Sequence, residues 1–492
     1  MTAVALLPSI LASLPEIIVV TGACILLIAG QFVPKGRDAV LVWSSVAIVL
    51  LAALGTFTLS GGAQPAYAGM FVADPFSVFF KSVFYLAIVL TFLLSRNYVD
   101  IEGIGGSEYY VLLLLALSGM MIMASATDLL AIYVGLELMV LCTYVLTGFL
   151  RREQRSNEAA LKYVILGAVS TGIFLYGVSL VYGLTGTTQL DRMAAAVTGD
   201  PLDPGLLLAV VFIVAGLVFK IGAVPFHMWV PDVYEGAPTT ITAFMSVGPK
   251  AAGFAVILRV FLNPLVAGSN VWIILAVIAV VTMALGSFVA LVQDNFKRLL
   301  AYSSIAHAGF AIFGIVAGGA DGVASVMLYL LIYTFMNLGI FGAVIMMRNG
   351  NFSGEVIEDY AGFAKLHPGL ALLMLLYLFS RGYSANGRLF CQVLRAGRAR
   401  RAWFCPARRD RSTLERCRRL FLHPHRHGDV HARAGTGVRA GADASGRRRS
   451  RRHCRRHGRH RSVSSMVSEA RSAVGLRRLS DRICIGLCDG IN

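Results

Sequence analysis

The sequence has few charged residues for its length. Asp, Glu, Lys and Arg make up 14% of the 492 residues, whereas they make up roughly a quarter of a typical soluble domain. Hydrophobic residues reach 57%, and the mean hydropathy is +0.70. This composition excludes a disordered chain, a collagen and a disulfide-rich secreted module. It also argues against a water-soluble enzyme, so we expect a protein that crosses the membrane many times.

The first 380 residues also lack the motifs that hold cofactors or metal ions. They contain only two cysteines, Cys24 and Cys142, both in apolar stretches, and we interpret them as packing residues. There is no GxGxxG sequence, no Walker loop, no CxxCH and no plausible Ser/His/Asp arrangement. We therefore expect no cofactor-binding residue, no metal ligand and no redox centre in this chain.

Apolar stretches of bilayer length recur through the same region. A helix needs about 20 residues to cross the hydrocarbon core. We predict such helices near residues 14–33, 39–59, 75–95, 109–126, 128–149, 160–185, 205–227, 238–264, 271–293, 299–318 and 323–347. A twelfth begins near residue 369 and is cut at Ser380. The predicted fold class is an all-α polytopic membrane protein.

Loop charges predict the orientation of these helices, because Lys and Arg gather on the cytoplasmic side. If the N-terminus lies outside, the outer loops hold only Arg192. The inner loops then hold Lys35, Arg37, Arg96, Arg151, Arg152, Arg155, Lys297, Arg298, Arg348 and Lys365. The N-terminus is therefore predicted on the outer, periplasmic side.

Three ionisable residues fall deep inside predicted helices: Glu137, Lys220 and Lys250. A charge at the centre of a membrane helix costs at least ~2.5 kcal/mol on insertion scales, so it needs a reason. One reason is a structural ion pair, and the other is a proton relay. Burial disfavours a charged ammonium and a nearby carboxylate favours it, so such a group can change protonation when the carboxylate moves. We favour the relay.

The backbone after Lys220 indicates a break in the helix. Gly222 and Pro225 follow within five residues, and proline removes a helix hydrogen bond and clashes with the preceding turn. Such a break is tolerated in a membrane only where it lines protein or a wet cavity. His227 and Trp229 are expected where the helix leaves the core. His227 either extends the relay or is an ordinary interfacial histidine.

Other polar residues are weaker candidates. Glu158 and Lys162 form an i,i+4 pair that fits either the relay or the surface of a helix. Lys297 is either a positive anchor or a relay group, and His307 is deep enough to face water or a charged partner. Glu16 is expected at the membrane interface. Polar residues that would help to hold a chain of water are Tyr144, Tyr163 and Asn337.

Two stretches carry a resemblance to a known family. KIGAVPFHMWVPDVYEGAPTTITAFMSVGPKAAGFA, Lys220–Ala255, and DNFKRLLAYSSIAHAGF, Asp294–Phe310, resemble signatures of the antiporter-like subunits of proton-pumping NADH:quinone oxidoreductase, respiratory complex I. The motif VYEGAP and the chain length under 500 residues are similar to those of the subunit N branch of this family. The resemblance implies the antiporter-like fold: 14 helices, two inverted five-helix repeats, helices 4–8 and 9–13, and broken helices 7 and 12. About 12 helices are visible here.

The resemblance also implies a function and roles for residues. Glu137, Lys220 and Lys250 match the family's relay residues on helices 5, 7 and 8. The chain would translocate protons, driven by NADH:quinone electron transfer in other subunits that use NADH, FMN, iron–sulfur clusters and quinone. Its partners would be other membrane subunits of complex I and the lipid of a bacterial inner membrane, with no nucleic acid. The alternatives are a stand-alone cation/proton antiporter and a purely structural membrane scaffold.

The chain is expected to divide into four parts. Residues 1–108 would form three N-terminal helices, and residues 109–264 the first antiporter-like repeat. Residues 265–380 would form a truncated second repeat. Residues 381–492 form an Arg-rich tail that we expect to be out of frame and unstructured.

The tail differs from the rest of the chain in composition. It holds 28 Arg, no Lys, six of the eight Cys and seven of the ten His. A basic binding tail would mix Lys with Arg, and a zinc module needs closely spaced pairs such as CxxC, which are missing. Codons for Arg381–Ala396 can be chosen that, read one base later, give AGIPPTAGFFAKFYVL, and those for Glu415–Val430 permit SVVAAFFYIRIVMVMY. The first resembles the family's lysine-bearing helix 12, so we interpret the tail as frameshifted.

Overall fold

The structure is a computed structural model that describes residues 3–34, 38–58, 64–104, 106–196, 204–262, 271–348, 354–360, 368–369 and 371–374. The predicted Arg-rich tail lies outside the described residues, and so do residues 370 and 375–380 of the predicted twelfth helix.

The N-terminal half contains long helices and one short hairpin. The helices are α1 (Ala3–Ala12), α2 (Leu14–Gly30), α3 (Asp38–Thr58), α4 (Pro75–Glu102), α5 (Ser107–Ser125), α6 (Leu129–Thr147), α7 (Gln154–Thr185) and α8 (Leu190–Ala196). Between α3 and α4, strands β1 (Gln64–Ala66) and β2 (Phe71–Ala73) pair antiparallel on either side of the 3₁₀ turn η1 (Tyr67–Gly69). The predicted all-α polytopic membrane fold is therefore confirmed, and this short hairpin is a local addition between two of its helices.

The second half continues the same pattern. Its elements are α9 (Pro204–Ile221), α10 (Trp229–Gly236), α11 (Thr239–Leu262), α13 (Val271–Ala290), α14 (Phe296–Ala317), α15 (Gly319–Met347) and the 3₁₀ turn η2 (Ile357–Tyr360). Ten of the described helices are long and apolar enough to cross a membrane, and α2 is a shorter apolar helix. Each of the eleven predicted stretches thus contains a helix, although the predicted 205–227 helix ends at Ile221.

Local capping explains where several helices begin. Asp74 and Ser77 form a capping box at the start of α4, with Pro75 in its first turn. The side chain of Asp128 accepts hydrogen bonds from the first amides of α6, and that of Asn295 does so for α14. These polar residues interrupt the apolar sequence. They define the first residues of the helices, which the hydropathy pattern alone does not locate.

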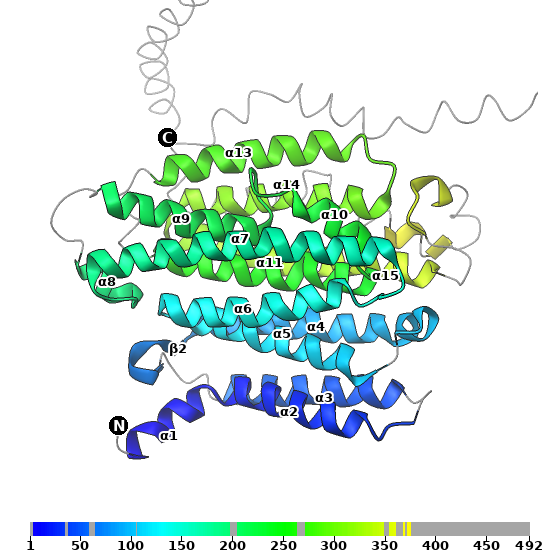
Figure 1. Ribbon diagram of the computed structural model, residues 1–492, viewed down its shortest axis with the longest axis horizontal. Helices are drawn as coiled ribbons and strands as arrows, with labels where there is room; N and C mark the ends of the chain where they lie inside the picture. The colour runs from blue at the N-terminus through cyan, green and yellow to red at the C-terminus, as the bar shows by residue number, and fades with distance from the viewer. Residues whose placement is uncertain are drawn as a thin grey trace, which may run out of the picture. The chain divides into compact units, whose positions relative to one another are not determined.

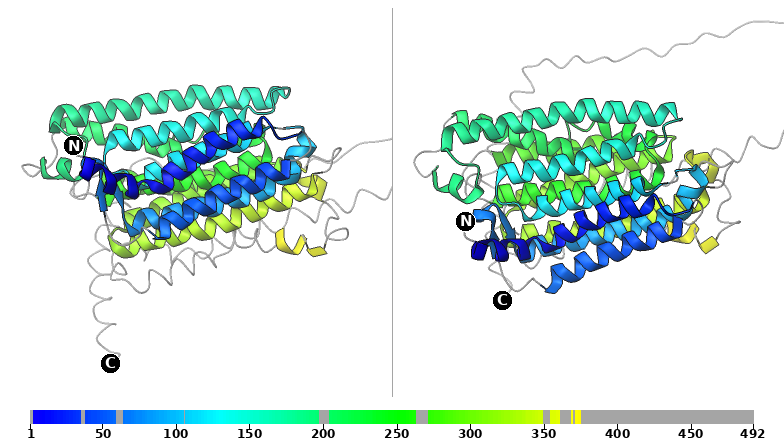
Figure 2. Two further views of the ribbon diagram at one scale, coloured as in Figure 1. Left: turned by 90° about the horizontal axis from the view of Figure 1, so that it is seen from below. Right: turned by 60° about the horizontal axis from the view of Figure 1, so that its bottom comes forward.

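The helices run side by side (Figures 1 and 2). In the view of Figure 1, α2 and α3 lie on one edge and α13 on the opposite edge. Helix α11 lies inside, packed against α4, α5, α9 and α15. Every residue in its most apolar window is buried, whereas only 28% of the corresponding window of α13 is buried. The core is therefore built around α11, the helix that carries Lys250.

Candidate functional site

The seventh predicted span is broken directly after Lys220. Helix α9 ends in a Schellman motif, in which the amide of Ala223 donates to the carbonyl of Val218 and the amide of Gly222 donates to that of Phe219. Gly222 has a φ of +72°, which a residue with a side chain rarely adopts. Lys220 lies in the last turn of α9, where a positive charge is favoured by the helix dipole. The predicted discontinuity is confirmed.

The groups freed by the break find partners in neighbouring helices. The amide of Val224 donates to the hydroxyl of Thr282 on α13 at 3.0 Å, and the indole of Trp229 donates to the carbonyl of Phe219 at 2.9 Å. Trp229 also stacks on Tyr163, with ring centroids 4.6 Å apart. Trp229 is buried at the start of α10. Trp229 is therefore held inside the protein, and the chain forms a new helix, α10, directly after the break. The depth of His227 and Trp229 in the membrane stays a prediction.

Lys220 is buried between α6, α7 and α9. Its side chain donates a 3.3 Å hydrogen bond to the hydroxyl of Thr171 on α7. Glu137 on α6 acts on it electrostatically, although the two make no direct ion pair in the part of the chain that the structure describes. One oxygen of Glu137 is buried with no hydrogen-bond partner among these residues. One oxygen of this carboxylate is therefore held by none of the described residues.

Lys250 lies on the other side of the break. A Cβ atom added to Gly222 would be 3.8 Å from its Nζ atom. Nζ donates to the carbonyl of Ser304 on α14 at 3.2 Å, contacts the Ser304 hydroxyl, and lies 5.7 Å from the ring centre of Tyr234 on α10. The structure thus places the two predicted lysines beside the same irregular turn.

His307 continues this line of polar groups into the next helices. It follows Ser304 by one turn of α14 and is 7% exposed. Its Nδ1 atom hydrogen-bonds to the hydroxyl of Tyr329 on α15. Sequence reasoning missed Ser304 and Tyr329. The only signal was the spacing of three residues between Ser304 and His307, which places both on one face of a helix.

His227 lies within the break, between α9 and α10. Its Nδ1 atom is buried and, among the described residues, has no hydrogen-bond partner. Among the described residues Lys250 contacts Ser304, and His307, one turn later on α14, contacts Tyr329, whereas His227 makes no hydrogen bond to Lys220.

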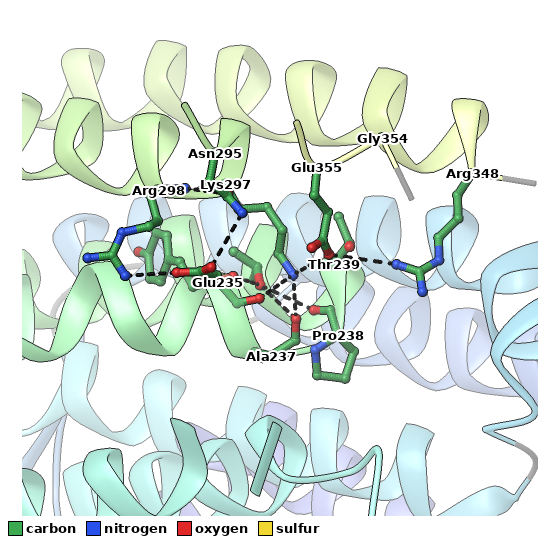
Figure 3. A network of polar contacts seen from close by, with 12 residues as sticks. Glu235, Ala237, Pro238, Thr239, Asn295, Lys297, Arg298, Arg348, Gly354 and Glu355 are labelled. Carbon is green, nitrogen blue, oxygen red and sulfur yellow. Dashed lines mark hydrogen bonds and ion pairs between the residues drawn. The ribbon is translucent and has the colours of Figure 1, made fainter. Parts of the chain in front are cut away.

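The ends of α10 and α14 meet in a network of charged groups (Figure 3). Lys297 is buried, and Nζ donates to the carbonyls of Glu235 and Ala237 at 2.8 and 2.9 Å and contacts the carboxylate of Glu355 at 3.3 Å. Arg298 pairs with Asp232 and Glu235 at 2.9 and 2.8 Å. Lys297 is thus a buried residue in the first turn of α14, and its role as a positive anchor or a relay group stays a prediction.

The network extends from there in two directions. Lys162 pairs with Glu158 at 2.8 Å, as its sequence spacing indicated, and also with Asp232 at 3.0 Å. Arg348 lies 3.8 Å from Glu355 and also pairs with Glu102 at the end of α4. The network therefore ties α7, α10 and α14 to the end of α4 and to the segment after α15.

Two further ion pairs lie toward the other ends of the helices. Glu16 on α2 pairs with Lys81 on α4 at 2.6 Å, and both side chains are buried. Glu16 is therefore buried in the protein and paired, and its place at the membrane interface stays a prediction. Sequence reasoning missed Lys81. Asp74 pairs with Arg259 through two hydrogen bonds. Burial alone would raise the pKa of Asp74, but the hydrogen bonds and charge of Arg259 outweigh it and hold that pKa below its usual value.

The described residues include no cluster of three His, Cys, Asp or Glu side chains that would hold a metal ion. Tyr144 and Tyr163 pack edge to face at 4.6 Å, and Asn337 donates to the hydroxyl of Ser246 on α11 at 3.2 Å. Tyr144 of α6 is thus packed against Tyr163 of α7, and Asn337 of α15 is hydrogen-bonded to α11, the helix that carries Lys250.

Comparison with known proteins gives the family. Residues 126–383 match the family described as NADH:quinone oxidoreductase/Mrp antiporter, TM. NADH-quinone oxidoreductase subunit N 2 of Rhizobium meliloti (strain 1021) is 85% identical over 380 residues, which is 77% of this chain and 79% of that protein. Subunit N of Coxiella burnetii is 42% identical over 381 residues, covering 76% of this chain and 79% of that protein.

Solved structures agree with these relatives. A chain of respiratory complex I from Thermus thermophilus with bound Aureothin is 30% identical, with a TM-score of 0.64, and the match covers 83% of this chain and 86% of that one. A chain of the Mrp complex from Dietzia sp. DQ12-45-1b shares the fold at 20% identity, with a TM-score of 0.61 over 80% and 78% of the two chains. The chain described here belongs to the NADH-quinone oxidoreductase subunit N family of antiporter-like membrane subunits.

Proposed function

We propose that this chain conducts protons across a bacterial inner membrane as a subunit of complex I, with its N-terminus on the periplasmic side. The observation that carries the proposal is the placement of two buried lysines, Lys220 and Lys250, on either side of the broken turn at Gly222. Charges are costly at membrane depth and are found there mainly where ions or protons move. Broken helices at the site of transport are a general device of membrane transporters.

The residues divide into a modulating pair and a relay. Glu137 acts on Lys220 without touching it, so movement or neutralisation of the carboxylate changes how strongly Lys220 holds its proton. Lys250 receives the proton beyond the break, where it contacts Ser304. His307 lies one turn later on α14 and is the next group of the proposed path. Tyr329 then provides the next polar group on α15. His227 lies inside the break and is a further acceptor for this path.

The proposal assigns electron transfer to other subunits. Those subunits would hold NADH, FMN, the iron–sulfur clusters and the quinone, and this chain would contribute only proton conduction and contacts with neighbouring membrane subunits. The first antiporter-like repeat would comprise residues 109–264, and residues 265–380 would begin the second, inverted repeat. The N-terminal part, residues 1–108, would pack alongside them.

We further propose that the chain beyond residue 380 is read in a shifted frame. The family match ends at residue 383, close to the point where the hydropathy collapses. The shifted reading would restore the lysine-bearing helix 12 that the second repeat needs. Without it, the second repeat would lack the lysine that the family carries on helix 12.

The test is Lys220→Ala in the assembled complex. The matched control is Glu16→Leu combined with Lys81→Met, which removes a buried lysine and its partner outside the relay. We expect Lys220→Ala to lower quinone reduction and proton pumping together, while assembled complexes with the double variant pump normally. Full pumping by assembled Lys220→Ala would contradict the proposal. Failure of this chain to copurify with other subunits would favour a stand-alone antiporter instead.

A further inference from the structure

Lys297 has an unusual set of partners for a buried lysine. Its ammonium donates to two backbone carbonyls, those of Glu235 and Ala237, and only its third contact, with Glu355, is a carboxylate. The two carbonyls belong to the end of α10 and its C-cap residue. The last carbonyls of a helix have no partner within the helix, and a positive charge there is favoured by the helix dipole. Lys297 therefore caps α10.

Arg298, the residue after Lys297, binds acidic side chains of α10. Arg298 pairs with Asp232 and Glu235, which lie three residues apart on α10. Consecutive residues at the start of α14 thus bind the backbone end of α10 and its acidic face (Figure 3). An eight-residue helix is too short to be stable alone, so its position depends on such contacts.

The position of α10 in turn defines the surroundings of both relay lysines. Tyr234 of α10 lies beneath Nζ of Lys250. Trp229 of α10 hydrogen-bonds to the carbonyl of Phe219, the residue before Lys220. A shift of α10 would therefore change the packing at Lys250 and the end of α9 at the same time.

We propose that Lys297 is a positioning residue of the proton path and not a proton carrier: its fixed positive charge holds α10 in place between Lys220 and Lys250. Glu355 extends this hold to the segment that follows α15, and Arg348 lies beside it. The role of Lys297 in proton conduction rests on the proposed function. The contact by which Lys297 caps α10 can be tested separately from proton conduction.

Arginine separates the two roles. It carries a positive charge and several donors, but it does not release its proton in proteins. If Lys297 positions α10, Lys297→Arg should keep at least half of the pumping and an unchanged pH profile, whereas Lys297→Met should lose most of it. If Lys297 carries protons, both variants should fail alike.

A second substitution covers the case in which the larger guanidinium does not fit. Glu355→Gln removes the one carboxylate on Lys297 and leaves both carbonyl contacts. Positioning predicts less than a twofold loss of pumping, because the cap remains. A proton path through Lys297 and Glu355 predicts a loss as deep as that of Lys297→Met, and this result would overturn the proposal.

A spin-label distance reports on α10 without reference to activity. Met228, just before α10, and Val292, just before α14, are 73% and 74% exposed and suit cysteine labelling. The distance distribution should be unchanged in Lys297→Arg and broadened in Lys297→Met. An unchanged distribution in Lys297→Met would refute the capping role. Full pumping in Lys220→Ala with a broadened distribution in Lys297→Met would instead refute the proposed proton path alone.

Discussion

The buried pair of Glu16 and Lys81 offers a quantitative test of how α2 is held on α4. The charged atoms lie 2.6 Å apart, and the two side chains are 7% and 3% exposed. Removing one partner of such a pair leaves an uncompensated buried charge, which costs about 3–5 kcal/mol. At about 1.4 kcal/mol per factor of ten, Glu16→Gln or Lys81→Met should reduce the folded-to-unfolded ratio by roughly 10²- to 4 × 10³-fold.

Replacing both partners should give the opposite result. Glu16→Leu combined with Lys81→Met removes both charges and fills the space with apolar atoms, and such exchanges are often neutral or stabilising. Because a membrane complex unfolds irreversibly, the measurement is the half-life of this chain in purified complex at a fixed elevated temperature. We expect both single variants to be short-lived and the double variant to approach the wild type.

A control separates the buried pair from ordinary surface charges. Glu158→Gln removes one partner of the exposed Glu158–Lys162 pair, whose side chains are 60% and 44% exposed. Such i,i+4 pairs contribute only about 0.2–0.5 kcal/mol, so the half-life should hardly change. If the double variant at Glu16 and Lys81 loses as much as the two single variants together, the charges are not coupled and the reasoning fails.

Three further predictions concern the relay, the orientation and the tail. Glu137→Gln should impair turnover severely and Glu137→Asp should keep part of it, since only the second keeps a charge; equal pumping by Glu137→Gln and wild type would refute the modulating pair. Single cysteines at Arg152 and Gly186, which flank α7, should be labelled from the cytoplasmic and periplasmic sides, and labelling of both from one side would overturn the orientation. Sequencing the gene across codons 375–395 should reveal the frame change, and the frame-restored chain should complement a strain lacking this subunit; a confirmed written frame together with complementation by the written chain would refute it.

The sequence was most informative where one helix could be considered alone. The apolar runs located every described long helix, and Gly222 with Pro225 located the break, because both effects act within a few residues. Lys81 escaped notice within the apolar run of α4, and its partner Glu16 is 65 residues away on α2. Pairing of this kind depends on how helices pack, which a single sequence does not encode locally. The cap on α10 was missed for the same reason, since its donor, Lys297, belongs to α14.

The burial of α11 has a consequence for how the protein is made. Its most apolar window is entirely buried and has a mean hydropathy of 1.6, against 2.7 for α13 at the edge. Helix α11 also carries Lys250 and Pro249. Because a buried lysine makes insertion of a single helix into lipid less favourable, contact with lipid alone stabilises α11 in the bilayer only weakly. We therefore expect α11 to be retained during synthesis by α4, α5 and α9, which precede it in the chain and contact it in the finished protein. The helix that carries the central lysine would then enter the membrane through contacts with protein and not through contact with lipid.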